Sequence, residues 1–398
     1  MFFACLAATF VLRPLRDQFG VDRGVDQLPY LYSLTLLATV FVVLPFWWLA
    51  NRMSSRRFVP LMLHVFTVGL LILAFGLSAA GDYEWSAQPL LGEAFWGGFN
   101  ALNVAVPALV WIHAVEHFGR DQARRQFGLI AVGGTLGAVF GSWGARLLAS
   151  QPVWCAVVGA AVLLQVAGFA FLRSVRHCRQ LERSAGIPVN AGGGLLEGIR
   201  VLGRDGRARS IAVYMVLLGV VATAFYAAQA ELVGEEIKSA RGQYEWLANK
   251  EILTQTFVLL LQVFCTGRLL SAWPAVVLLI SLPVVSMVGL SVWWLAPTAV
   301  GIFCVDVVRR GARFALEKPA REVLYTPFDL ATKHKVKFLL DTFAYRLGDL
   351  LGALLQVALR RFDIGTGGVV VVTLGFALLS IAVALKLARS QSSPPPIS

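Results

Sequence analysis

The sequence predicts an all-α polytopic membrane protein with about twelve transmembrane helices in two six-helix halves. Composition is the first reason. Of the 398 residues, 57% are hydrophobic and only 15% are charged, with a mean hydropathy of +0.70, whereas soluble domains are roughly 45–50% apolar. The second reason is run length, since apolar runs of about 20 residues recur and match a membrane-spanning helix. Barrel strands would be about half as long and would alternate in polarity.

Twelve spans are predicted, with limits 1–19, 28–50, 58–80, 94–117, 127–149, 153–173, 210–233, 250–267, 273–295, 298–316, 335–359 and 367–388. Basic connections alternate with short, acidic or mixed ones, and the connection holding Arg360 and Arg361 is the exception. Because basic loops stay in the cytoplasm, we expect both termini there, in a bacterial inner membrane. No cleavable signal peptide is visible in the first run, and a natural start upstream of Met1 stays open.

The longest connection divides the spans six and six. We expect an N-terminal half over 1–173, a basic cytoplasmic linker over 174–209 and a C-terminal half over 210–389. The linker holds a glycine run at 192–194, typical of a flexible segment. The Ser/Pro-rich residues 390–398 are expected to be disordered.

Charges inside the first span are the main pointer to a substrate path. Arg13, Arg16 and Asp17 are three and four residues apart, so one helix face can hold all of them. Charge within the bilayer usually marks a pathway, and guanidinium groups suit phosphate or carboxylate. The alternative is an internal Arg–Asp pair that only holds helices together.

The eleventh span carries a polar stripe, with Arg346 beside it; its members are Lys337, Asp341, Tyr345, Gly348, Asp349 and Gly352. A polar stripe on an otherwise apolar helix predicts a cavity lining. The alternative for Lys337 is a side chain that reaches from the helix end to the interface. Arg321 and Glu322, at the end of the tenth span, are further candidates, or else a solvated pair of little energetic value.

Amides and glycines give weaker signals. Asn100 and Asn103 in the fourth span could hydrogen-bond a substrate or, more commonly, a neighbouring helix. Gly133, Gly137 and Gly141 fall four apart in the fifth span, the spacing of a close helix–helix contact. Glu231 could relay protons or pair with an arginine.

Enzyme signals are poor, so we predict that the chain is not an enzyme. There is no phosphate loop of the ATP-driven pumps and no nucleophile elbow, and the five histidines lack metal-ligand spacing. We therefore expect no cofactor and no metal. The net charge of +12 follows from basic loops, which excludes nucleic acid as the expected partner and leaves the lipid bilayer.

The layout resembles the major facilitator superfamily, and so does the loop Asn51-Arg52-Met53-Ser54-Ser55-Arg56-Arg57, although it has Asn51 where that signature has Asp. Further runs resemble the bacterial and plastid nucleotide transporters, the ATP:ADP antiporter family, and most of all its branch in free-living bacteria. They are 12–17, 99–104, 125–137, 321–326 and 337–346. The resemblance implies that Arg16 and Lys337 contact substrate phosphates. Arg16 replaces a lysine of that family, and an acidic residue expected early in the fourth span is absent.

These patterns together predict an alternating-access secondary transporter for a small anionic solute, with nucleotides or other phosphate esters as the leading class. A proton-coupled carrier of another solute, with Asp341 or Glu231 titrating, is the alternative. A transport-inactive membrane scaffold or sensor is a third possibility. The oligomeric state, the direction of flux and the coupling ion stay open.

Overall fold

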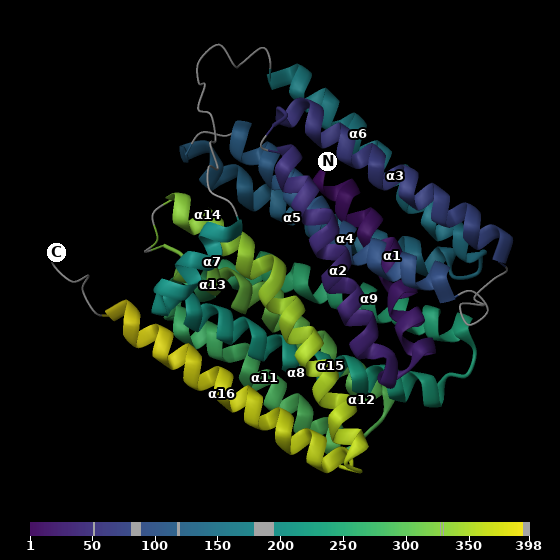
Figure 1. Cartoon of the computed structure of the whole chain (residues 1–398), viewed down its shortest axis with the longest axis vertical. Coiled ribbons are helices and arrows are strands. Elements are labelled where there is room, and N and C mark those ends of the chain that lie inside the picture. The colour runs from purple at the N-terminus through teal and green to yellow at the C-terminus, as the bar shows by residue number, and fades with distance from the viewer. Residues whose placement is uncertain are drawn as a thin grey trace. The chain divides into compact units, whose positions relative to one another are not determined.

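The computed structural model describes residues 1–50, 52–80, 89–117, 120–178, 195–326, 328 and 330–392. Over these residues the chain is almost entirely helical and contains no strand (Figure 1). It divides into two compact units. Unit 1 comprises Met1–Arg23, Leu37–Asn190 and Ile237–Leu259, and unit 2 comprises Gly24–Leu36, Ala191–Glu236 and Leu260–Ser398. The predicted division at 1–173 and 210–389 stays a prediction.

Unit 1 is built from long helices. These are α1 (Phe2–Arg23), most of α2 (Leu28–Ala50), α3 (Ser55–Ala80), α4 (Pro89–His117), α5 (Arg120–Leu148), α6 (Val153–Cys178) and most of α9 (Ala240–Leu261).

Unit 2 contains interrupted helices as well as continuous ones. In chain order they are η1 (Val25–Gln27), α7 (Leu195–Arg204), α8 (Gly206–Glu236), η2 (Gln262–Thr266), α10 (Gly267–Ala272), α11 (Ala275–Leu295), α12 (Ala299–Ala312), η3 (Arg313–Glu317), α13 (Lys318–Leu324), α14 (Leu330–Leu339), η4 (Leu340–Ala344), α15 (Tyr345–Arg361) and α16 (Thr366–Ser392). The segments η2, η3 and η4 are single π-helical turns that join the α-helices on either side without a break.

Helices occupy all twelve predicted spans, but several run further than predicted. The helix that begins with α9 starts at Ala240 rather than at 250, where Ser239 Oγ accepts a hydrogen bond from Gly242 N at 3.2 Å. The tenth continues through α13 to Leu324. Hydropathy detects only the apolar part of a helix, whereas caps and backbone bonding determine where the helix ends. Part of the predicted linker is also helical, because α7 lies within it. This helix packs against α8 and α14.

Among the residues that the structure describes, eight helices are long and apolar enough to cross a membrane by length and composition. The predicted spans outside this set are α1, α5, the helix from α12 to α13 and the helix from α14 to α15. All four carry several charged side chains. The helices with the weakest membrane signal are therefore the ones that hold most of the candidate site residues.

Glycines bring α1 and α5 together in unit 1. A Cβ on Gly137 would collide with the carbonyl of Phe3, and one on Gly141 would collide with the carbonyl of Ala7. A Cβ on Gly133 would meet nothing within 4 Å. The predicted close contact is therefore confirmed for two of the three glycines. The other main contacts of this unit are α3 with α6 and α1 with α6.

Unit 2 uses the same device between α8 and α15. Cβ atoms on Gly348 and Gly352 would press on the α8 backbone at Val216 and Val220. Helix α16 packs on α8 and on α11. In unit 1 the first predicted span packs against the fifth and the sixth, and the third packs against the sixth. In unit 2 the seventh span (α8) packs in the same way against the eleventh (α15) and the twelfth (α16), and the ninth (α11) packs against the twelfth. This repetition is typical of transporters built from two related halves.

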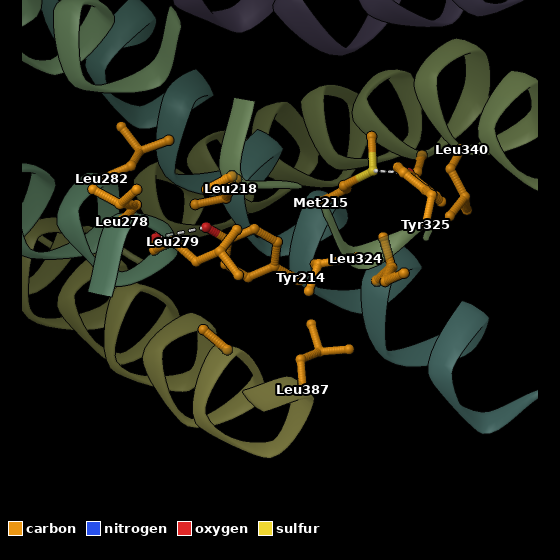
Figure 2. Packing of buried hydrophobic residues seen from close by; sticks show 14 of the residues in the cluster. Tyr214, Met215, Leu218, Leu278, Leu279, Leu282, Leu324, Tyr325, Leu340 and Leu387 are labelled. Atoms are coloured by element: carbon orange, nitrogen blue, oxygen red, sulfur yellow. Dashed lines mark hydrogen bonds between the residues drawn. The ribbon is translucent and has the colours of Figure 1, made fainter. Parts of the chain in front are cut away.

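The hydrophobic core of unit 2 lies between α8 and the helices that pack against it. Tyr214 is fully buried and its hydroxyl donates to the Leu279 carbonyl of α11 at 2.8 Å (Figure 2). Tyr325, also fully buried, places its hydroxyl 3.9 Å from Met215 Sδ (Figure 2). Leucines of α11, α13, η4 and α16 fill the space around both rings. This core holds the ends of α13 and η4, which carry the charges described below.

Candidate functional site

Arg13 in α1 is paired with a carboxylate that the sequence analysis did not single out. Its Nε lies 3.3 Å from Glu251 Oε1 of α9, and both residues belong to unit 1. The Arg13 side chain is 21% exposed, whereas that of Glu251 is 0% exposed. Gln255, one turn further along α9, donates to Glu251 Oε2 at 3.2 Å. The Arg13 guanidinium is therefore partly exposed, whereas the carboxylate that it pairs with is buried and hydrogen-bonded.

Arg16 lies one turn further along α1. Its Nη1 is 3.0 Å from Asp17 Oδ1. Its guanidinium carbon is 4.8 Å from the ring centre of Trp96 and 5.4 Å from that of Phe99, both in α4. Cation–π contact with fully or nearly fully buried rings lets a charge stay in a low-dielectric setting. We call Arg13, Arg16, Asp17 and Glu251 the unit 1 charge cluster.

The amides of α4 do not extend this cluster. Asn100 is buried, and its Nδ2 donates to the Trp96 carbonyl of the same helix at 2.8 Å. Asn103 is half-buried. Glu93 forms an ion pair with Arg23 of α1 at 3.5 Å. Asn100 is thus bonded to its own helix rather than to a neighbouring helix, and its role toward a substrate stays a prediction.

A second cluster surrounds Arg321 in unit 2. Arg321 Nε lies 3.5 Å from Glu317 Oε1, and Arg321 Nη2 lies 3.6 Å from Asp341 Oδ1. Lys337 Nζ donates to Glu322 Oε2 at 2.7 Å. We call these five residues the unit 2 charge cluster. It joins α13 to α14 and η4, so the sequence-predicted residues Arg321, Glu322, Lys337 and Asp341 do come together.

Aromatic stacking adds Tyr345 to the edge of this cluster. The guanidinium carbons of Arg313 and Arg321 lie 4.3 Å and 5.3 Å from the Tyr345 ring centre. The hydroxyl of Tyr345 is buried and finds no hydrogen-bond partner among the described residues. Two cations over one ring place a concentrated positive potential beside α15.

The sequence predicts one continuous polar stripe along the eleventh span, and this prediction is wrong. The π-helical turn η4 changes the register between Lys337 and Tyr345. Lys337 and Asp341 meet α13, while Gly348 and Gly352 meet α8. Asp349 pairs with Arg346 of its own helix at 3.5 Å. A constant helical period therefore does not describe this span.

A hydroxyl group links two of the π-helical turns. Thr266 Oγ1, at the end of η2, lies 2.9 Å from the Ala315 carbonyl of η3 and 3.1 Å from the Leu261 carbonyl. A π-helical turn widens the helix and leaves backbone groups to find other partners, and such turns are frequent at functional sites. η3 presents Glu317 and η4 presents Asp341 to the same guanidinium.

Several charged residues of the cluster helices lay outside the sequence-based selection. Glu251 and Glu317 were missed, although both are fully buried. Asp306 and Arg309 are joined at 2.6 Å, also buried. A signal existed: each carboxylate lies one helical turn from other charged or amide side chains in a segment that continues an apolar run. Extending the helices through those polar turns would have found them.

The remaining candidates lie apart from both clusters. Glu231 pairs with Arg360 at 2.7 Å. His113 hydrogen-bonds Ser174 at 3.1 Å. Arg52 stacks on Trp48 with its guanidinium carbon 4.1 Å from the ring centre, and Asn51 lies outside the described residues. No group of three potential metal ligands occurs among the described side chains.

Comparison with known proteins places the fold. No protein-family model matches the sequence, and no curated protein matches it. Solved structures match over nearly the whole chain. The nucleoside transporter NupG is 15% identical, with 99% of this chain and 98% of that chain covered and a TM-score of 0.64. A bacterial homologue of the human lysosomal transporter Spinster, inward-facing and unoccupied, is 14% identical, with 99% and 96% covered and a TM-score of 0.58.

The outward-facing major facilitator superfamily transporter FucP is 14% identical, with 98% of this chain and 99% of that chain covered and a TM-score of 0.52. Identities at this level establish the fold alone. The chain therefore has the all-helical fold of major facilitator superfamily transporters.

Proposed function

We propose that this chain is an alternating-access secondary transporter of the bacterial inner membrane that exchanges nucleotides or other phosphate-bearing anions. The observation that carries the proposal is the unit 1 charge cluster. Two guanidinium groups, 21% and 12% exposed, sit within the first predicted span, while their carboxylate partners are more deeply buried. Partly exposed cations within a span usually serve a solute path.

The chemistry of these cations suits a phosphate group. An arginine fork can make two parallel hydrogen bonds to phosphate oxygens, and such charge-assisted bonds are stronger than neutral ones. Arg13 would exchange Glu251 for the substrate, and Arg16 would exchange Asp17. Lys337 would do the same with Glu322 in unit 2. Each cation already has a carboxylate partner, so an incoming anion would compete with that carboxylate for the cation.

Two further observations support the anion class. The runs that contain Arg16 and Lys337 resemble the ATP:ADP antiporter family, and one structural neighbour is named as a nucleoside transporter. Exchange of one anion for another needs no ATPase and no metal. In unit 1, Asn103 joins Arg13 and Arg16 as a candidate substrate or positioning residue. In unit 2, the candidates besides Lys337 are Arg321, Asp341, Tyr345, Arg346 and Asp349.

Uptake into liposomes tests this proposal. Purified protein is reconstituted, and labelled ATP is offered to vesicles loaded with ADP and to empty vesicles. We expect uptake only into the loaded vesicles. Arg16→Ala and Lys337→Ala should abolish it, while Arg16→Lys and Lys337→Arg, which retain the charge, should keep part of it. Arg52→Ala is the control, because its stack on Trp48 lies outside both clusters.

Wild-type exchange rates in both alanine variants would refute the role of these cations. A second candidate function is a proton-coupled carrier, favoured by the burial of Glu317. In that case labelled solute would accumulate in empty vesicles when the outside is acidic.

A further inference from the structure

Glu317 is a buried carboxylate to which no described residue donates a hydrogen bond. It is the last residue of the π-helical turn η3 and its side chain is 0% exposed. Neither carboxylate oxygen has a hydrogen-bond partner among the described residues. The nearest cationic nitrogen, Arg321 Nε, is 3.5 Å away, longer than the 2.7–2.9 Å of a charge-assisted hydrogen bond. Glu317 is therefore desolvated and only loosely compensated.

The guanidinium beside it is shared. Arg321 is 4% exposed and also lies 3.6 Å from Asp341, while its Nη1 is buried and has no hydrogen-bond partner within the described part of the chain. Asp341 differs from Glu317 because its side chain is 34% exposed and can be solvated. One arginine thus serves two carboxylates and forms a short bond with neither. Water can solvate Asp341 in place of the arginine, but Glu317 is not exposed to water.

The other groups facing Glu317 are known from each neighbouring element. η3 itself contributes Arg313, α13 contributes Lys318 and Arg321, and η4 contributes Asp341. The hydroxyls of Tyr345 in α15 and Tyr214 in α8 also interact with it electrostatically. α12, which also packs against η3, carries Asp306, Arg309 and Arg310. α11 packs against η3 without any ionisable side chain, and η2 contributes only the thiol of Cys265.

The burial of Glu317 favours its protonation, whereas the three cations around it oppose protonation. Three cations, Arg313, Lys318 and Arg321, face two carboxylates, so the set carries +1 when Glu317 is ionised and +2 when it is protonated. A buried carboxylate that lacks good hydrogen bonds is costly in its charged form, and protonation removes that cost. A set at +2 also attracts an anion more strongly than a set at +1.

We propose that Glu317 is a proton-binding site whose protonation strengthens the binding of the transported anion. One proton from water converts the carboxylate to a carboxylic acid, and the same proton returns to water when the anion leaves. By linkage, the anion raises the proton affinity of Glu317 by the same factor by which the proton raises anion affinity. Anion affinity then falls as pH rises through the titration of this group. The proton site stands on its own, whereas the coupling rests on the proposed anion transport.

Infrared difference spectroscopy of the purified protein tests the proton site without any substrate. Between acidic and alkaline buffer, the wild type should show a carboxylic-acid carbonyl band that shifts in heavy water. Glu317→Gln should lose this band, and Glu317→Asp should keep a displaced one. Glu236→Gln is the matched control, because Glu236 in the same unit only accepts a hydrogen bond from Ala299 N at 2.8 Å. A band that persists unchanged in folded Glu317→Gln protein would overturn the assignment.

Proteoliposomes test the coupling. An acidic exterior should speed wild-type uptake of labelled ATP severalfold, and Glu317→Gln should lose this acceleration while it still exchanges ATP for ADP at equal pH. Equal acceleration in the variant, or none in the wild type, would overturn the coupling. If neither protein moves any nucleotide, the proposed substrate fails, and the infrared band still decides whether Glu317 binds a proton.

Discussion

Replacing Arg13 with methionine should destabilise unit 1, because Glu251 would be left charged and buried. At 3.3 Å, a unit charge pair attracts by about 5 kcal/mol with an effective dielectric constant of ~20. Losing one partner of a buried pair costs about 3–5 kcal/mol. Gln255 still donates to Glu251, so we expect the lower end of that range, about 3 kcal/mol.

The double-mutant cycle separates the buried charge from the rest of the side chain. Glu251→Gln alone should cost about 1 kcal/mol, because Arg13 keeps access to water and the amide can bond Gln255. Arg13→Met combined with Glu251→Gln should cost about 2 kcal/mol, less than Arg13→Met alone and about half of what simple addition gives, so the coupling is about 2 kcal/mol. Denaturant titration in detergent, followed by tryptophan fluorescence, measures all four proteins.

A more exposed ion pair within the same unit is the control. Arg146 and Glu245 connect α5 to α9 at 3.4 Å, almost the same distance, but their side chains are 38% and 30% exposed. Solvent-exposed pairs contribute about 0–1 kcal/mol, so Arg146→Met should change little. Equal losses in the two arginine variants, or simple additivity in the Arg13–Glu251 cycle, would refute the argument from burial.

Three further outcomes follow from the packing. Gly137→Leu should abolish recovery of folded protein in size-exclusion chromatography, because even a Cβ there meets the α1 backbone, whereas Gly133→Leu should be tolerated; loss in both would contradict the assigned contact. Glu231→Gln and Arg360→Ala should each lower stability by no more than about 1 kcal/mol in the same titration, because both side chains are over a third exposed. Thr266→Val should cost about 1–2 kcal/mol, since it removes the hydroxyl that links η2 to η3, while Thr266→Ser should be neutral; a neutral valine variant would show that the link contributes nothing.

The class of fold could be predicted closely because the bilayer imposes a length on each apolar run. The predicted limits 28–50 coincide with α2. The α1–α5 contact was also predictable at Gly137 and Gly141, because small residues four apart allow close approach. The start of α9 at Ala240 was not, since its first turns are polar and depend on a cap at Ser239.

The candidate site was predictable residue by residue but not as an arrangement. Arg16 and Asp341 stand out because charge is rare in an apolar run. Glu317 does not stand out, because it follows a basic segment that reads as a helix end. The π-helical turn η4 changed the register of the eleventh span, and a shift in backbone hydrogen bonding leaves no periodic mark in the side chains.

The sequence by itself determined that the chain is built from long apolar helices typical of a membrane protein, and which of its helices carry charge. These are properties of single residues and short runs, because the cost of placing a side chain in hydrocarbon is paid locally. Only the tertiary structure decided which charges meet. Arg13 of α1 faces Glu251 of α9, and Arg321 of α13 stands between Glu317, one helical turn earlier, and Asp341 of η4. Such pairing depends on the rotation and register of each helix against its neighbours, which packing sets.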